Sequence, residues 1–283
     1  MQSINGERQS TKWGGDLERP SKQFSLWRTV FSTALTLMLF CTSAQAQQKG
    51  VVSDSLLIKS EILGYTQQYW VYTPPEYESG KEFPVLFLAD GAWYLEPGGL
   101  PNVLDTLIGS GEVEPVIAVF LDARVPGYPH LNRRNGQFFC NKKYIQFYQE
   151  EFIPAVEKAF KTQADRSGRT IAGLSFGGLN AACFGLFAHE SFAGIAMQSP
   201  ATHPVRYLHQ AYQDSTRLPL NIFLSSGDHK DNESRTRAFR DILQAKQYPM
   251  KYIEVPFAHN WDNWKPLLDD MLLYFYGTSS DLD

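Results

Sequence analysis

A serine flanked by glycines stands where the chain passes from a predicted strand into a predicted helix. The apolar run Thr170-Ile171-Ala172 is followed by Gly173-Leu174-Ser175-Phe176-Gly177-Gly178, and the helix-like stretch 179–187 comes next. The turn of a G-x-S-x-G motif is too tight for side chains at its flanking positions, and glycine removes them. The motif therefore predicts Ser175 as a nucleophile held out of the sheet. The alternative is a glycine-rich turn that only connects a strand to a helix.

The histidine best placed to activate this serine is His259, which follows the predicted strand 252–255. In an open parallel sheet, functional groups collect beyond the carboxyl ends of the strands, so His259 and Ser175 are expected at one edge. Trp261 and Trp264 follow His259 and give an otherwise exposed loop two large apolar anchors. We predict that His259 is the general base.

Two aspartates compete for the acid that orients this histidine. The predicted strand 220–224 runs into Gly227, and both Asp228 and Asp231 lie just beyond it. Either aspartate gives the chain order Ser, Asp, His that follows a nucleophile elbow. We favour Asp231, which stands one position beyond the usual G-x-x-D spacing, and keep Asp228 as the alternative. The other aspartate would stabilise the amino terminus of the predicted helix 233–246.

Around these residues the chain resembles the Putative esterase family of α/β-hydrolases, which includes enterochelin, feruloyl and acetylxylan esterases and S-formylglutathione hydrolase. The resemblance covers nearly all of the expected mature chain and is greatest for the enterochelin esterase branch. One departure is Gln137, where that branch usually has a glutamate three residues after the loop arginine. The segments that carry the resemblance are Tyr72 to Tyr77, Phe83 to Trp93, Phe120 to Ala123, Arg133-Arg134, Asn141, Gly173 to Gly178, and His259-Asn260-Trp261 with Trp264.

Ester hydrolysis passes through a tetrahedral oxyanion, which two preorganised backbone amides can stabilise. The amide of Phe176, directly after the nucleophile, is the expected first donor. The resemblance implies a second donor just after Gly91, and we assign it to Ala92, with Trp93 as the neighbouring alternative. The competing interpretation of Asp90-Gly91 is an ordinary turn.

Substrate recognition is predicted for Trp93, Arg134 and Trp261, which lie in loops expected at the same edge. Aromatic rings in these loops are suited to stack on an aromatic acyl group or a sugar ring. The planar guanidinium group of Arg134 is suited to carboxylates, catecholates and sugar hydroxyls. The alternative for Arg134 is a surface charge or a structural pair with Glu150 or Glu151.

The composition is that of one enzyme-sized domain after an export signal. Lys22 and Arg28 precede the apolar stretch 29–41, and an A-x-A site ends at Ala46. This order predicts a cleavable signal peptide over residues 1–46 and a single catalytic domain over 47–283. We expect a periplasmic or secreted protein without stable membrane insertion after cleavage. The competing interpretation is an uncleaved amino-terminal membrane anchor.

Strands and helices alternate along the mature chain after an antiparallel beginning, which predicts an α/β-hydrolase fold with a doubly wound, mostly parallel sheet. Two longer stretches, 95–111 and 201–217, are expected to be irregular. Cys140 and Cys183 are expected to be free thiols, with Cys183 buried, because a helix interior seldom lies within disulfide reach of a distant loop. The expected strands are 55–61, 68–72, 85–89, 116–121, 170–172, 194–198, 220–224 and 252–255, and the expected helices are 144–161, 179–187, 233–246 and 264–275.

These features predict an exported serine esterase that acts on a small-molecule or carbohydrate-linked ester, such as a siderophore lactone or a feruloyl or acetyl ester. No metal or other cofactor is expected. The formal net charge of -4 argues against nucleic acid as the main partner. Two alternatives are an acyltransferase that passes the same acyl group to a sugar or glycolipid, and a noncatalytic binding protein on a hydrolase scaffold.

Overall fold

The computed structural model describes residues 48–278. The signal peptide predicted at residues 1–46 and its boundary with the catalytic domain lie outside the described residues. Within the described part of the chain, no helix is both long enough and apolar enough to cross a membrane.

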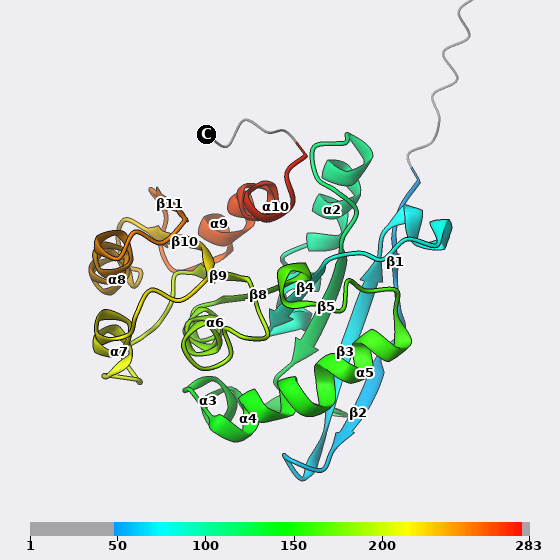
Figure 1. Ribbon diagram of the computed structural model, residues 1–283, viewed down its shortest axis with the longest axis horizontal. Coiled ribbons are helices and arrows are strands. Elements are labelled where there is room, and N and C mark those ends of the chain that lie inside the picture. Colours follow the sequence, from blue (N-terminus) through cyan, green and yellow to red (C-terminus); the bar gives the residue numbers. More distant parts are fainter. Residues whose placement is uncertain (1–47, 279–283) are drawn as a thin grey trace, which may run out of the picture. The chain divides into compact units, whose positions relative to one another are not determined.

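A nine-stranded mixed sheet runs through the centre of the described chain (Figure 1). The strand order is β1-β3-β5-β4-β8-β9-β10-β11, and β2 pairs with β3. The first three strands pair antiparallel, whereas β5, β4 and β8 to β11 pair in parallel. The bounds are β1 (Val51–Val52), β2 (Leu56–Ser60), β3 (Tyr65–Thr73), β4 (Val85–Ala89), β5 (Ile117–Asp122), β8 (Arg169–Leu174), β9 (Gly194–Gln198), β10 (Asn221–Gly227) and β11 (Met250–Val255), with a separate hairpin of β6 (Arg124–Val125) and β7 (Tyr128–Asn132).

Helices cover both faces of the sheet, so the predicted doubly wound α/β fold with antiparallel N-terminal strands is confirmed. A π turn (Tyr148–Phe152) joins α4 to α5. The helices are α1 (Gly91–Leu95), α2 (Leu100–Gly109), α3 (Arg134–Phe138), α4 (Lys142–Phe147), α5 (Ile153–Ala159), α6 (Phe176–Phe187), α7 (Leu208–Asp214), α8 (Glu233–Ala245), α9 (Trp261–Trp264) and α10 (Leu268–Tyr276).

The sheet separates two hydrophobic cores. Successive side chains of a strand point to opposite faces, and β4 shows the result: Val85, Phe87 and Ala89 join the core that includes α4, α6 and α8. Leu86 and Leu88 join the core that includes α2 and α10. Because β4 is buried on both faces, it reads in the sequence as a continuous apolar run.

Two stretches expected to be irregular contain helices. Residues 95–111 include α2 and residues 201–217 include α7. Between Gly99 and Gly111 the apolar residues of α2 recur at helical spacing, a pattern that predicts this helix from the sequence. Its buried apolar residues are Leu100, Leu104, Leu107 and Ile108.

The expectation of two free thiols was wrong, because Cys140 and Cys183 form a disulfide with their Cα atoms 5.0 Å apart. From the sequence, Cys140 was expected in a loop remote from the helix that carries Cys183. In the structure, Cys140 is the second residue after α3, which packs against α6, the helix that carries Cys183. Cys183 is fully buried, as expected.

Candidate active site

Ser175 lies at the turn between β8 and α6, as predicted. Its backbone has a φ of 57°, a conformation that costs a non-glycine residue about 1 to 3 kcal/mol. A Cβ atom at Gly173 would overlap the backbone of Gly177, so strand and helix meet too closely for any side chain there. The Ser175 amide donates a hydrogen bond to the Gln198 carbonyl at 2.8 Å, which ties the turn to the end of β9.

His259 is in hydrogen-bond contact with this serine. Its Nε2 atom lies 2.9 Å from the Ser175 Oγ. The imidazole ring packs edge to face against Trp264, with the ring centroids 4.9 Å apart. The tryptophan expected to anchor this loop therefore fixes the ring that faces Ser175.

Asp231, and not Asp228, reaches the histidine. The Asp231 Oδ1 atom contacts His259 Nδ1, and the Asp231 side chain is fully buried. The Asp228 side chain is 44% exposed and pairs with the neighbouring His229. The structure therefore brings Ser175, His259 and Asp231 into one hydrogen-bonded chain.

Several donors hold the second carboxylate oxygen of Asp231. Ser199 Oγ donates at 2.6 Å, the Gly227 amide at 2.5 Å and Asn263 Nδ2 at 3.0 Å. Burial alone would raise the pKa of Asp231, but the hydrogen bonds from His259, Ser199 and Gly227 lower it to about 2. Asp231 is therefore a carboxylate at neutral pH.

Ser199 and Asn263 were missed in the sequence. Ser199 directly follows β9 and accepts hydrogen bonds from Trp264 Nε1 at 2.9 Å and Asn263 Nδ2 at 3.1 Å. The strand-end rule that located Ser175 would also have pointed to Ser199, since β9 is the neighbour of β8. Asn263 had no such signal, because its place depends on how α9 turns toward Asp231.

The amides predicted to stabilise an oxyanion lie at the first turns of two helices. Phe176 is the first residue of α6 and Ala92 is the second of α1, and amides in a first turn have no acceptor within their own helix. The Trp93 amide instead donates to the Asp90 carbonyl at 2.8 Å, which favours Ala92 over its neighbour. A Cβ atom at Gly91 would overlap the Phe120 backbone, so α1 begins directly against β5.

A buried ion pair contacts the two segments that carry these amides. Arg134 Nε lies 2.9 and 3.0 Å from the two Asp90 carboxylate oxygens, and Nη2 lies 2.8 Å from Oδ2. The Arg134 guanidinium group also lies over the rings of Trp93 and Phe176, at 4.7 and 5.4 Å from their centroids. Burial raises the pKa of Asp90 to about 6, against the opposing charge and hydrogen bonds of Arg134. The pair therefore contacts both segments that carry the candidate oxyanion donors.

The partner of Arg134 is thus Asp90 and not Glu150 or Glu151, the carboxylates considered in the sequence. The substrate contact predicted for Arg134 stays a prediction, because only 16% of its side chain is exposed and the Asp90 carboxylate occupies its Nε edge. Trp93 is 37% exposed. Trp261 packs edge to face on Trp264, with centroids 5.6 Å apart.

A cavity of about 280 Å³ opens at the serine and histidine. A base, an oriented nucleophile and backbone amides at helix amino termini are the parts needed for acyl transfer. The residues that line the cavity are Ser175, Phe176, Ala201, His203, Lys230, Asp231, Asn232 and His259.

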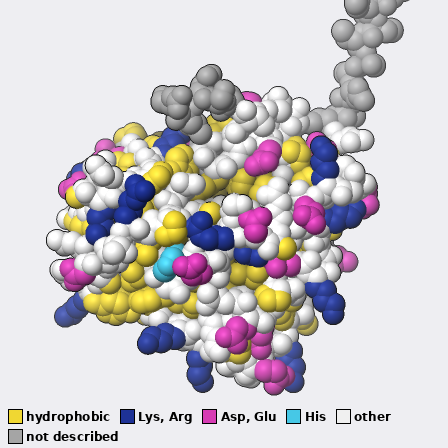
Figure 2. Space-filling view, viewed as in Figure 1, with side chains coloured by type: hydrophobic (Ala, Val, Ile, Leu, Met, Phe, Trp, Pro, Cys, Tyr) yellow, Lys and Arg dark blue, Asp and Glu magenta, His cyan; other side chains and the backbone are white. Residues whose placement is uncertain are grey.

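The face of the protein shown in Figure 2 has a mixed surface. Acidic and basic side chains alternate with apolar ones across it, and no broad area of that face carries one sign of charge.

Comparison with known proteins gives one family. The model of a family described as "Putative esterase" matches residues 60–275. An endo-1,4-beta-xylanase/feruloyl esterase of Xylanibacter ruminicola is 26% identical over 223 residues, which are 75% of this chain and 30% of that protein. An iron(III) enterobactin esterase of Escherichia coli (strain K12) is 30% identical over 154 residues, 54% of this chain and 37% of that protein. The matched segments thus span about a third of these two relatives.

The fold is shared with a solved ferulic acid esterase. That structure superposes with a TM-score of 0.69 at 22% sequence identity and covers 82% of this chain and 98% of its own. At this identity the likeness concerns the arrangement of the sheet and helices.

Proposed function

Because the chain belongs to the Putative esterase family, a family of carboxylic ester hydrolases, we propose that it is an exported serine esterase with Ser175, His259 and Asp231 as its catalytic triad. The observation that carries this proposal is the 2.9 Å contact between His259 Nε2 and Ser175 Oγ. The Asp231 carboxylate on the other side of the ring supports it, because it holds the imidazole in the tautomer that leaves Nε2 free to accept a proton.

In the proposed mechanism, Ser175 Oγ attacks the ester carbonyl carbon while His259 Nε2 takes the hydroxyl proton. The carbonyl oxygen becomes an oxyanion and accepts hydrogen bonds from the amides of Phe176 and Ala92. The oxyanion then collapses, the ester C–O bond breaks, and His259 returns the proton to the leaving alcohol oxygen. Water repeats the two steps on the acyl-enzyme and releases the acid.

Export is a second part of this proposal. It rests on the charged, apolar and A-x-A segments that occur in order within residues 22–46. The Cys140–Cys183 disulfide supports it, since disulfides persist mainly in oxidising compartments. Expression of the full chain should yield a periplasmic or secreted protein whose first residue, by N-terminal sequencing, is Gln47.

The substrate class follows from the relatives. Their names describe a feruloyl esterase and an iron(III) enterobactin esterase, and we propose that this chain hydrolyses a siderophore lactone or a carbohydrate-linked feruloyl or acetyl ester. Purified protein is tested against a catecholate trilactone, methyl ferulate and acetylated xylan. Ester formation with added alcohol acceptors would instead indicate an acyltransferase.

Reaction with a fluorophosphonate probe tests the nucleophile. The wild-type protein should become labelled. Ser175→Ala should not become labelled, and its kcat should be lower by about 10³-fold or more. Ser234→Ala, at an exposed serine of α8, is the matched control and should keep both. Hydrolysis by Ser175→Ala within tenfold of the wild type would contradict the assignment.

A further inference from the structure

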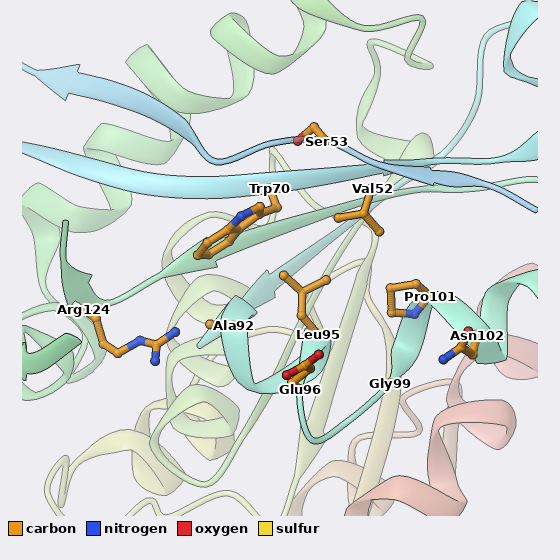
Figure 3. Close-up of a pocket in the computed structure, with 10 residues that line it drawn as sticks. All are labelled: Val52, Ser53, Trp70, Ala92, Leu95, Glu96, Gly99, Pro101, Asn102 and Arg124. Carbon is orange, nitrogen blue, oxygen red and sulfur yellow. The ribbon is translucent and has the colours of Figure 1, made fainter. Parts of the chain in front are cut away.

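Two cavities larger than the one at Ser175 differ in the charge of their walls. The first, of about 640 Å³, has both Arg124 and Glu96 in its wall (Figure 3). Arg124 is already paired, because its Nε atom lies 2.7 Å from Asp122 Oδ2. The second, of about 430 Å³, contains Arg133 and no acidic residue among the described residues that line it. The residues of this second wall, which we call the Arg133 cavity, are Tyr65, Asn132, Arg133, Asn135, Gly136 and Asn141.

The Arg133 side chain is held in place, but its charge is not neutralised. Its guanidinium carbon lies 4.1 Å from the centre of the Tyr65 ring, and its Nη1 atom lies 3.5 Å from the Thr66 carbonyl oxygen and from Gln67 Oε1. These partners carry no charge. Across residues 48–278, no carboxylate forms an ion pair with Arg133, and its Nε and Nη2 atoms have no hydrogen-bond partner. The cavity therefore presents one fixed positive charge with two donors free to take an anion.

Amide side chains supply most of the remaining wall. Asn132 and Asn135 are both exposed, and a side-chain amide both donates and accepts hydrogen bonds. Asn141 is already in use, because its Oδ1 atom caps α4 and its Nδ2 atom donates to the Gly136 carbonyl. An apolar ligand would displace water from these amides without replacing its hydrogen bonds, whereas hydroxyl groups can replace them. The wall therefore favours a ligand with several hydroxyl groups.

Two buried glutamines behind this wall have polar atoms without partners. Gln67 and Gln137 are 0% and 1% exposed. Gln67 Oε1 faces Arg133, and Gln137 Nε2 donates to the Tyr65 hydroxyl at 3.1 Å. Gln67 Nε2 and Gln137 Oε1 have no partner within the described part of the chain. Because unpaired buried polar atoms reduce stability, this polar wall favours a binding role over a purely structural one.

We propose that the Arg133 cavity binds a sugar acid of the uronic acid class. The Nε and Nη2 atoms of Arg133 pair with the carboxylate through two parallel hydrogen bonds, and the amides of Asn132 and Asn135 bind hydroxyl groups of the sugar ring. The volume of about 430 Å³ lies within the range of small-molecule sites. The cavity shares no lining residue with the one at Ser175, so this binding site is separate from that of the reacting ester.

Calorimetric titration of the purified protein with D-glucuronate, D-glucose and acetate tests the inference. D-glucuronate should bind at least about tenfold more tightly than either of the others, because only it combines the carboxylate with the hydroxyl groups. Acetate binding as tightly as D-glucuronate would leave a simple anion site, and equal binding of D-glucose would mean that the charge is unused. Either result, or no binding of D-glucuronate, would overturn the inference.

The test is independent of the proposed esterase activity. Ser175→Ala should bind D-glucuronate as tightly as the wild type does, because Ser175 does not line this cavity. A wrong triad assignment would show in the fluorophosphonate reaction and in turnover, and it would leave this titration unchanged. A wrong assignment of the Arg133 cavity would show only in the titration.

Variants of the wall locate the binding site. Arg133→Gln removes the charge, and its affinity for D-glucuronate should fall about tenfold or more. Asn135→Asp keeps the arginine and adds a negative charge at an exposed position, so its affinity should fall about fivefold or more. Arg206→Gln, at an exposed arginine outside the cavity, is the matched control and should bind as the wild type does. If Arg133→Gln does not fold, Asn135→Asp decides. Unchanged affinity in either folded variant would overturn the inference.

Discussion

Two buried aspartates follow strands on opposite sides of the strand that leads to Ser175. Their surroundings shift the pKa of the carboxyl group in opposite directions. Asp90 and Asp231 have side chains only 4% and 0% exposed. Hydrogen bonds from several donors lower the pKa of Asp231 to about 2, whereas burial raises the pKa of Asp90 to about 6 despite its contact with Arg134. Burial raises the pKa of both carboxylates; the hydrogen bonds to Asp231 outweigh this effect, whereas the charge and hydrogen bonds of Arg134 do not outweigh it at Asp90.

The difference matches what each position must do. In the proposed mechanism, Asp231 stabilises the positive charge that His259 acquires in the transition state, so it must stay ionised at every working pH. Asp90 contacts no reacting group and holds Arg134 against the segments of Ala92 and Phe176. Its charge matters for the position of those amides. The experiments below test this contrast from the largest expected effect to the smallest.

Removal of the Asp231 charge should have the largest effect. In Asp231→Asn the amide favours the wrong histidine tautomer, and kcat should fall about 10³- to 10⁴-fold with little change in ligand affinity. Asp228→Asn, at an exposed carboxylate on the same loop, should stay within about twofold of the wild type. Steady-state kinetics on one activated ester measures both. Equal, small losses would mean that Ser175 and His259 work without an aspartate.

Removal of the Asp90 partner should mainly affect stability. Arg134→Ala leaves a buried carboxylate without its cation, which costs about 3 to 5 kcal/mol in the free energy of unfolding. Urea unfolding measures this loss, and Asp90→Asn combined with Arg134→Ala should recover part of it. We expect the variant's kcat to fall by a similar factor on small and large esters. A selective rise in KM for an anionic ester would instead support the substrate contact predicted for Arg134.

The pH dependence of stability should separate the two aspartates. The folded state holds the Asp90 proton more tightly than the unfolded state, so the Asp90 contribution is fully present below pH 4 and is lost as the pH rises through 6. The stability of the wild type relative to Asp90→Asn should therefore fall by about 2 to 3 kcal/mol between pH 4 and 7. The Asp231 contribution has the opposite sign and is lost only as the pH falls toward 2. Asp228→Asn is the control, and a difference that is flat with pH for Asp90→Asn would contradict the contrast.

Loss of a single donor to Asp231 should have the smallest effect. Ser199→Ala removes one of the hydrogen bonds to Oδ2 and leaves the others. A hydrogen bond to a charged group contributes about 1.5 to 3 kcal/mol, so turnover should fall about 10- to 150-fold, with the triad contacts intact. Ser234→Ala serves again as the control. A loss as large as that of Asp231→Asn would mean that Ser199 takes part in the chemistry.

The sequence predicted the contacts among Ser175, His259 and Asp231 better than the ion pair of Asp90 and Arg134. Ser175, His259 and Asp231 each follow a strand of the parallel sheet, and a parallel sheet gathers its carboxyl ends at one edge. The choice between Asp228 and Asp231 stayed open because spacing alone does not determine which side chain turns inward. Lys230, with a φ of 50°, reverses the chain between the two.

The ion pair of Asp90 and Arg134 depends on contacts between distant elements, which no local sequence pattern predicts. Arg134 meets Asp90 only because the short helix α3 packs against α6. The same packing brings Cys140 to Cys183, so the missed ion pair and the missed disulfide have one cause. The helix α2, by contrast, could have been predicted from the sequence, because its buried apolar residues recur at helical spacing.

The disulfide also limits how far the chain can spread when it unfolds. Cys140 and Cys183 are 43 positions apart, and the loop that they close contains β8, the turn with Ser175 and α6 as far as Cys183. Closing a loop of that length removes unfolded conformations worth about 4 kcal/mol in the chain-entropy description. The segment that carries the proposed nucleophile therefore remains covalently linked to the end of α3 even in the unfolded chain. Refolding does not have to bring these two segments together from a distance.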